Sequence, residues 1–247
     1  MVNINNVYQT VLVIANKDNR GYITPAEFNR LADQAQNEIF ESYFNREAAY
    51  EGNSNLTSDF SDPTLNVSEK INVFYKEAAL TETNGIHTYP DDLRSLGVVS
   101  VNNVVADKAS HSDIKYINLS PLTYPVATQP VYTLNSNGIK VYPSSVTTGV
   151  SIDYLKNPIR PKWGYLMPTP AQITAGVPNE PIYDPTAFDP ANDSYDTPAK
   201  SYNFELHPSE FQELVVTILA YAGVVIKQAD VVGFAQSKEQ EFQATEQ

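Results

Sequence analysis

The sequence predicts an α+β protein in which N- and C-terminal helices pack as a bundle, with an inserted small antiparallel β-module and a long Pro-rich loop. Apolar residues recur at helical spacing in the first and last parts of the chain, β-branched residues gather in the middle, and prolines cluster after them. We expect a helical part at 1–94, the β-module at 95–155, the Pro-rich extended loop at 156–200 and a second helical part at 201–247. The two helical parts are expected to form one domain.

Two helices are predicted within 7–44, separated by a break around Gly21. Thr24 can cap the second helix, Pro25 suits its first position, and Glu27 can complete a capping box. Apolar residues at helical spacing mark the expected buried faces. They are Val7, Val11, Ile14 and Ala15 before the break, and Phe28, Leu31, Ala32, Ala35, Ile39 and Tyr43 after it.

The same break resembles half of an EF-hand calcium loop. Asn16 and Asp18 would take its positions one and three, Gly21 position six and Glu27 position twelve. Arg20, however, places a cation where a ligand oxygen belongs, and the capping box already accounts for Glu27. We therefore interpret the stretch as a capped helix–turn–helix. A calcium-responsive binding module that uses the loop at 16–27 is the alternative.

A polar stretch at 45–68 predicts a surface loop, followed by a third helix that starts near Ser68. The expected buried residues of this third helix are Ile71, Phe74, Tyr75 and Ala78. From Leu96 onward, β-branched residues predict strands, and the Asn137-Gly138 pair predicts a hairpin. The predicted strands are 97–101 with 104–106, 114–117, 131–134, 139–142 and 150–155.

Nine of the 17 prolines lie between Pro158 and Pro198, where no helical or strand period is present. This predicts a long extended excursion on the surface. Such loops in compact domains are usually functional or disordered, and the sequence leaves both possibilities open. A final helix is expected to open at Pro208, with His207 as its cap, and its apolar stripe runs from Phe211 to Ala229.

The composition narrows the possible functions. A formal charge of -13 and the lack of a basic cluster argue against tight binding to nucleic acid. No cysteine, signal peptide or membrane-length apolar run is present, so we expect a soluble protein. The histidines are far apart, and no phosphate-binding or nucleophile motif occurs. We expect no catalytic residue, cofactor or metal. An enzyme, such as a glycoside hydrolase, would rest only on scattered carboxylates such as Asp91 and Asp92.

Aromatic residues are the more informative surplus, with 16 Tyr and 10 Phe against one Trp. Trp163 lies near Tyr165 inside the Pro-rich segment. It either pins that segment to the core of its own chain or anchors a subunit interface, where such residues are enriched. The candidate residues for an interface with another subunit or a partner protein are Trp163, Tyr165, Tyr183, Phe188, Phe234 and Phe242.

Several short patterns spread along the chain carry a resemblance to a known family. They are Ala15-Asn16-Lys17, 20–29, 32–36, Tyr89-Pro90-Asp91-Asp92-Leu93, Val141-Tyr142-Pro143, Asp153-Tyr154-Leu155, Pro158, Pro161, Trp163 and Phe204-Glu205-Leu206-His207. With these, the chain resembles head–tail connector (adaptor, or ring) proteins of short-tailed bacteriophages, particularly the crAss-like group. The patterns touch most of the chain except the bulk of the Pro-rich segment, and none of them is catalytic.

The resemblance implies a structural virion protein and not an enzyme. It implies a homo-oligomer, a twelvefold (dodecameric) ring between the portal and the tail, which extends the DNA channel and docks further tail components. Its partners would be the portal protein and other tail ring proteins, with genomic DNA passing during ejection without specific binding and with no membrane contact. The protein would reside in the virion after assembly in the host cytoplasm.

Overall fold

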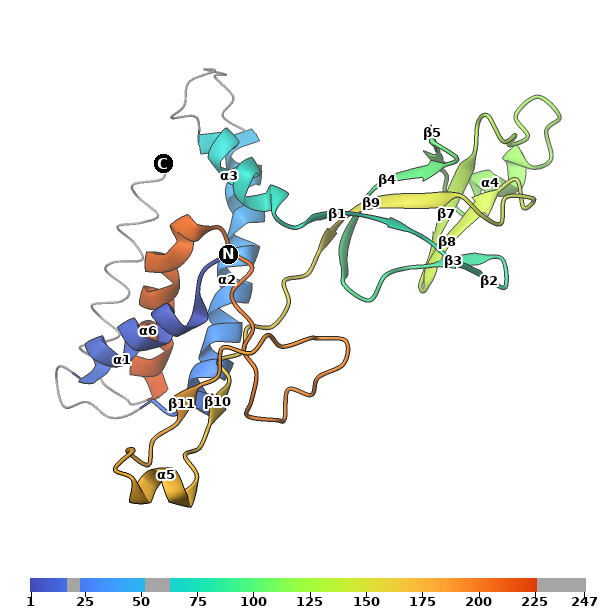
Figure 1. Ribbon diagram of the computed structural model, residues 1–247. Coiled ribbons are helices and arrows are strands. Elements are labelled where there is room, and N and C mark those ends of the chain that lie inside the picture. Colours follow the sequence, from blue (N-terminus) through green and yellow to red (C-terminus); the bar gives the residue numbers. More distant parts are fainter. Residues whose placement is uncertain (17–22, 52–62, 226–247) are drawn as a thin grey trace. The chain divides into compact units, whose positions relative to one another are not determined.

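The computed structural model describes residues 1–16, 23–51 and 63–225 (Figure 1). They contain both helices and β-sheets, which confirms the expected mixture of α and β structure. The chain divides into two compact units. We call Met1–Val73 with Pro158–Gln247 the helical unit, and Phe74–Asn157 the β unit. The β unit is one continuous insertion, so the sequence segments before and after it belong to the same helical unit.

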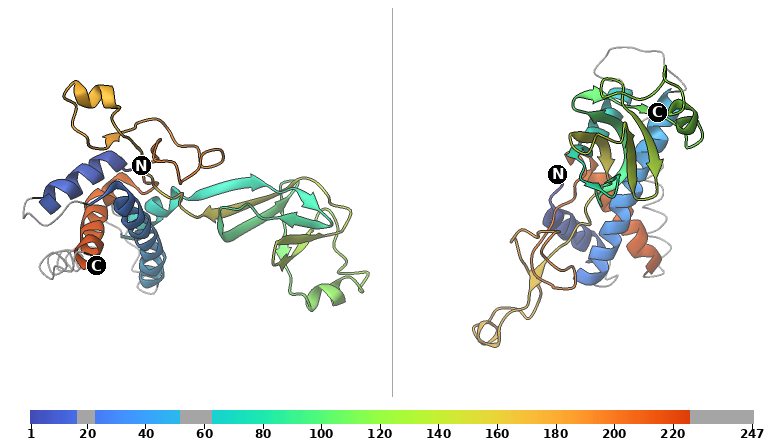
Figure 2. Two further views of the ribbon diagram at one scale, coloured as in Figure 1. Left: turned by 90° about the horizontal axis from the view of Figure 1, so that it is seen from below. Right: turned by 90° about the vertical axis from the view of Figure 1, so that its right-hand side faces the viewer.

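Helices dominate the described part of the helical unit (Figures 1 and 2). The elements are α1 (Ile4–Asn16), α2 (Pro25–Glu51), α3 (Pro63–Asn72), β10 (Tyr165–Leu166), α5 (Pro170–Thr174), β11 (Ile182–Tyr183), the 3-10 turn η1 (Pro208–Glu210) and α6 (Phe211–Val225). Helix α6 packs against α1 and α2, and α3 packs against α2. Strands β10 and β11 form an antiparallel pair that carries α5 at its tip and projects from the helices.

Two of the predicted helix starts, at Pro25 and at Pro208, are confirmed by their hydrogen bonds. At α2, the backbone N–H of Thr24 donates to Glu27 Oε2 at 2.9 Å, and the N–H of Glu27 donates back to Thr24 Oγ1 at 3.3 Å. These bonds satisfy donors that no earlier helical turn can satisfy. At η1, His207 Nδ1 accepts from the N–H of Ser209 at 3.3 Å, and α6 follows directly.

The core of the helical unit uses most of the predicted apolar positions. Phe28, Ala32, Ala35, Ile39 and Tyr43 form the buried face of α2, as expected. Two further buried sets come from the neighbouring helices, namely Val7 and Val11 of α1 and Leu214, Ile218 and Ala222 of α6. Ile14 was expected in the buried stripe of the first helix but is exposed, because the stripe ends before the last turn of α1.

The polar stretch predicted as a surface loop at 45–68 is largely helical where it is described. Helix α2 continues to Glu51, and α3 already begins at Pro63. The run Arg46-Glu47-Ala48-Ala49 consists of good helix formers, so polarity alone was misleading there. Residues 52–62 lie outside the described part of the chain.

The β unit consists of short strands and one short helix. They are β1 (Tyr75–Ala79), β2 (Glu82–Thr83), β3 (Ile86–Thr88), β4 (Leu93–Val101), β5 (Val104–Val105), β6 (Asp107–Lys108), α4 (Asp113–Ile117), β7 (Val131–Asn135), β8 (Gly138–Tyr142) and β9 (Val150–Lys156). One sheet has the strand order β1-β9-β4-β5, and the other has the order β2-β3-β8-β7-β6. The described pairings are antiparallel except for β6 with β7, which is parallel and departs from the expected antiparallel module.

Two predictions in this region were wrong. The third helix was expected to continue through Tyr75 and Ala78, but α3 ends at Asn72 and this stretch is strand β1, so the β unit starts at Phe74 and not at 95. Pairing of β1 with β9 supplies the backbone hydrogen bonds that override the helical spacing. The predicted strand at 114–117 is helix α4.

Both sheets of the β unit contribute side chains to one core. Its buried members are Leu80, Val99, Val101, Ala106, Tyr132, Ile139, Val141, Val150, Ile152 and Tyr154. The predicted hairpin is confirmed as β7–β8, although its turn residues are Ser136 and Asn137. Gly138 lies within β8, where a Cβ would collide with the backbone carbonyl of His87 on β3. Glycine is therefore needed for strand packing there rather than for the turn.

The Pro-rich segment is more ordered than an extended surface loop. Besides β10, α5 and β11, it contains a buried hydrogen-bond network around Asp184. The Asp184 carboxylate accepts from the N–H groups of Thr186 at 3.0 Å and Lys200 at 2.9 Å. These bonds hold the pKa of Asp184 below its ordinary value. Ser201 Oγ donates to the Asp184 carbonyl and accepts from the N–H of Gly164 at 2.9 Å. The two strands of the excursion are thus tied together at their base.

Candidate functional site

Trp163 joins the Pro-rich segment to the helical unit. Its side chain is 2% exposed and packs against Tyr8 of α1, with ring centroids 4.3 Å apart and the two ring planes tilted by 46°. The indole Nε1–H donates to Asn5 Oδ1 at 3.0 Å, so the polar edge of the buried ring also has a partner. Of the two roles considered for Trp163, the structure gives it the first, because the ring pins the segment to the core of its own chain.

Asn29 of α2 fixes the backbone at the same position. Its Oδ1 accepts from the Trp163 N–H at 2.7 Å, and its Nδ2 donates to the Trp163 carbonyl at 3.1 Å. The side-chain amide therefore satisfies both backbone groups of one residue, as a neighbouring strand would. Two turns further along α2, the Gln36 side chain accepts from the N–H of Glu205 at 3.1 Å and donates to the carbonyl of Ile159 at 2.8 Å.

The other expected interface residues have different positions. Tyr165 and Tyr183 are half-buried and stack on Trp163, at 6.0 Å and 5.8 Å between ring centroids. Phe188 is buried, and the centroid of its ring lies 4.5 Å from that of the Tyr195 ring. Trp163 and Phe188 are therefore each enclosed by their own chain, and the interface role of these residues stays a prediction. Phe234 and Phe242 lie outside the described residues.

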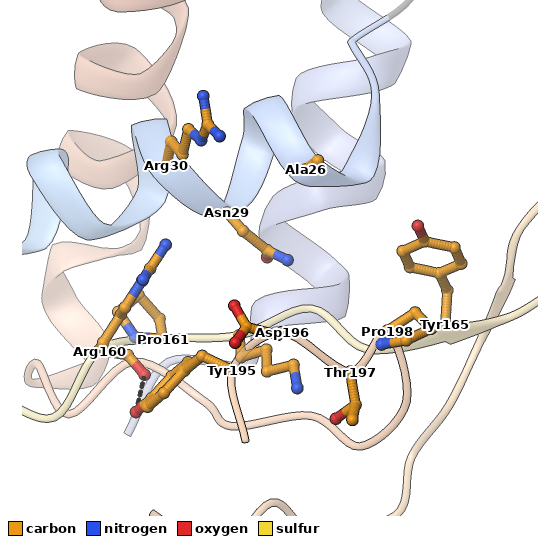
Figure 3. Close-up of a pocket in the computed structure, with 11 residues that line it drawn as sticks. Ala26, Asn29, Arg30, Arg160, Pro161, Tyr165, Tyr195, Asp196, Thr197 and Pro198 are labelled. Atoms are coloured by element: carbon orange, nitrogen blue, oxygen red, sulfur yellow. Dashed lines mark hydrogen bonds between the residues drawn. The ribbon is translucent and has the colours of Figure 1, made fainter. Parts of the chain in front are cut away.

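A pocket of about 540 Å³ lies beside this aromatic cluster (Figure 3). One side is the first part of α2, and the other is formed by the stretches 160–165 and 195–198. The lining residues are Ala26, Asn29, Arg30, Arg160, Pro161, Lys162, Tyr165, Tyr195, Asp196, Thr197 and Pro198. Three of them are cationic and one is a carboxylate, so the pocket is locally positive in a chain of formal charge -13.

Lys162 is an unusual component of the pocket because it is 3% exposed. Its Nζ donates to the Ser194 carbonyl at 3.3 Å and lies 4.4 Å from the centroid of the Phe188 ring. Burial lowers the pKa of Lys162, and the positive charges of Lys200 and Arg160 act in the same direction, whereas Asp193 and Asp196 oppose them. No described carboxylate lies within ion-pair distance of this ammonium group, since Asp193 pairs with Lys200 instead.

Two groups of exposed apolar residues form the remaining candidate surfaces. One lies on the projecting hairpin of the helical unit, and we call it the apolar hairpin: Leu166, Met167, Ile173 and Ile182. Leu166 and Ile182 are directly paired across β10 and β11, so their side chains share a face. The other begins within α4 of the β unit and continues into the loop after it, and we call it the distal apolar loop: Tyr116, Leu119, Leu122, Tyr124 and Val126. Leu122 is 97% exposed.

The calcium alternative is tested only in part. Residues 17–22, including Asp18, Arg20 and Gly21, lie outside the described residues. Glu27 would have to supply a bidentate ligand, but its Oε2 already accepts from the N–H and hydroxyl of Thr24, which hold its pKa below the ordinary value. Within the described ranges, no cluster of three or more potential metal ligands occurs.

Comparisons of the sequence with protein families and curated proteins identify no relative. No protein-family model matches the chain, and no curated protein matches it. Among the described helices, none combines the length and apolarity that a membrane crossing requires.

Sequence reasoning found the aromatic cluster but missed the pocket beside it. Lys162 and Arg160 are single cations in a Pro-rich stretch, and no pattern marks one as buried. Tyr195 and Asp196 lie in a turn much later in the sequence. The Tyr195 hydroxyl donates to the Arg160 carbonyl across a separation of 35 residues. The available signal was the neighbourhood of Trp163, since a buried Trp draws its flanking residues against the core.

Proposed function

We propose that this chain is a structural virion protein that forms a ring between the portal and the tail of a short-tailed bacteriophage. It would extend the DNA channel and offer docking surfaces for further tail components, as the resemblance implies. Its packed helices would form the body of each subunit, with the β unit and the Pro-rich segment as the contacting parts. The single observation that carries the proposal is the pair of exposed apolar surfaces.

The apolar hairpin and the distal apolar loop are suited to subunit contacts. Isolated exposed apolar residues are common on soluble proteins, but neighbouring ones on one ordered segment favour an interaction site. Leu119 is 79% exposed and Tyr116 is 73% exposed, so neither is covered by its own chain. A subunit that carries two separate surfaces of this kind can contact one neighbour with each, and such heterologous contacts form a ring when the rotation between subunits closes.

The charge of the chain supports passage of DNA rather than binding. Phosphate contacts require clustered Lys and Arg, whereas the formal charge is -13. Among the described cations, Lys70, Lys76 and Lys200 are already paired with carboxylates. A channel lined by such a protein would not retain DNA.

The proposal is tested by the native mass of the purified protein, alone and mixed with a portal protein. The expected result is a closed ring, or a monomer that is recruited in many copies onto the portal. A species that stays monomeric over a wide concentration range and ignores the portal would overturn the proposal.

Two charge-introducing variants locate the contacts, and a third is their matched control. Leu122→Asp changes the distal apolar loop and Ile182→Asp changes the apolar hairpin. Val105→Asp introduces the same charge at a position that is 64% exposed but outside both surfaces. We expect at least one of the first two variants to lose assembly while Val105→Asp assembles normally. Equal assembly of all three would refute the assigned contact surfaces.

A further inference from the structure

The pocket beside α2 has the properties of a binding site for an acidic ligand. We propose that it binds the carboxylate group of such a ligand, with Lys162 and Arg160 as its cationic donors. The inference does not depend on the proposed ring, since it rests on the pocket of a single subunit.

Lys162 provides the first argument. An ammonium group loses its hydration when it is buried, and proteins normally compensate this cost with a paired carboxylate. Here the described partners of Nζ are one carbonyl, at 3.3 Å, and the faces of two aromatic rings. An ammonium has three N–H donors, so this arrangement leaves capacity for an anion that enters the pocket.

Arg160 provides the second argument. Figure 3 shows its side chain extending from the 160–165 stretch toward α2. Its described ion pair joins Nε to Asp33 Oδ2 at 3.6 Å, and the guanidinium lies 5.4 Å from the centroid of the Tyr195 ring. The contact through Nε leaves the two terminal nitrogens, which form the fork that binds a carboxylate with two parallel hydrogen bonds.

The walls of the pocket indicate an organic acid rather than an inorganic anion. The carbon surfaces of Pro161, Pro198, Tyr165 and Tyr195 would stabilise an apolar ligand body, which a bare phosphate lacks. The volume of about 540 Å³ also exceeds what a single carboxylate needs, so the ligand would have a body that rests on these walls.

The test is calorimetric titration of the full chain with three probes. Glutarate represents a small carboxylate, a blocked peptide of four glutamates represents an acidic protein segment, and inorganic phosphate is the anion control. We expect heat from at least one carboxylate probe and weaker binding of phosphate. A stronger response to the peptide would assign the ligand to a protein segment, and a stronger response to glutarate would assign it to a small metabolite. Both results support the proposal.

Three variants connect the binding to the named residues. Lys162→Met and Arg160→Gln should each weaken binding of the preferred probe by about ten- to a hundredfold, the range for a hydrogen bond to a charged group. Lys115→Met, on the exposed face of α4, removes the same charge elsewhere and should leave binding unchanged.

A thermal melt separates binding from folding. Lys162→Met replaces a buried cation with an apolar side chain of similar length, so its melting temperature should equal or exceed that of the wild type. If this variant fails to fold, the exposed Arg160 still tests the site. No heat from either carboxylate, tighter binding of phosphate, or unchanged binding in Arg160→Gln would overturn the proposal.

Discussion

Replacing Trp163 by alanine distinguishes a core residue from an interface anchor. The ring is 2% exposed and contacts Tyr8, Tyr165 and Tyr183. Truncating a buried aromatic of this size costs about 3–5 kcal/mol, because the surroundings collapse only partly into the space. Domains of ordinary stability have a free energy of unfolding of about 5–15 kcal/mol. Trp163→Ala should therefore unfold the helical unit at a much lower urea concentration.

The milder Trp163→Phe variant isolates the hydrogen bond of the indole. It keeps an aromatic ring beside Tyr8 but removes the Nε1–H that donates to Asn5 Oδ1 at 3.0 Å. Loss of one neutral hydrogen bond with its partner left behind costs about 1–3 kcal/mol. We expect a free energy of unfolding between those of Trp163→Ala and the wild type.

The assay is urea unfolding followed by far-ultraviolet circular dichroism, since the variants lack the only Trp. Leu166→Ala is the control, because Leu166 lies three residues further along the Pro-rich segment but is 53% exposed and should change the free energy of unfolding by less than about 0.5 kcal/mol. Unchanged unfolding of Trp163→Ala, combined with loss of self-association, would refute the reasoning and restore Trp163 as an interface anchor.

Three further predictions concern single charged or titratable groups. Lys70→Met should lower the free energy of unfolding in urea by about 3–5 kcal/mol, because it removes the ammonium group that lies 2.8 Å from the buried Glu210 carboxylate. The double variant Lys70→Met/Glu210→Leu should recover most of that loss, because it removes the buried carboxylate as well. Burial lowers the pKa of His87 below its ordinary 6.5, so the unfolded chain binds the proton first as the pH falls. The contribution of His87 to stability is therefore complete above pH 6.5 and is lost as the pH drops through the folded pKa. His87→Gln should reduce the fall of the melting temperature over this acidic range. Excess calcium should leave the thermal melt unchanged, since Glu27 is engaged by Thr24, and a calcium-dependent rise in melting temperature would contradict this.

Local signals predicted the starts of α2 and η1 and the strands β4, β5, β7, β8 and β9. The capping box at Thr24 and Glu27 and the cap at His207 depend on residues within a few positions of each other, so the sequence contains the whole interaction. The alternation in β9 likewise reflects one buried face.

The errors arose where distant pairing or local chemistry outweighed the apolar pattern. At 75–79 the partner strand β9 decides the structure, and it lies about eighty residues later, as the pairing of Tyr75 with Leu155 shows. At 114–117 the two apolar residues Ile114 and Ile117 also fit a single helical turn, and the N–H of Asp113 finds the hydroxyl of Ser110 at 3.1 Å. A window of four residues could not separate the two patterns.

The candidate pocket was beyond sequence reasoning for a different reason. Its walls come from α2, from the Arg160 region and from the Tyr195 turn, three stretches that meet only after folding. Lys162 is buried only because these stretches pack around it, and lysine is among the residues least often buried. A sequence pattern therefore assigns it to the surface by default.

The discontinuous helical unit has a consequence for synthesis on the ribosome. Asn29 and the Trp163 backbone that it holds are 134 residues apart, and Val2 pairs with Phe204 in both directions, at 3.2 Å and 3.1 Å. At about 5–20 residues per second, the segment that completes the helical unit emerges on the order of ten seconds after α2. The β unit is continuous and needs no later residue, so it can be finished first while the nascent α2 still exposes its apolar face. Chaperone capture during translation should therefore concentrate on the N-terminal helices.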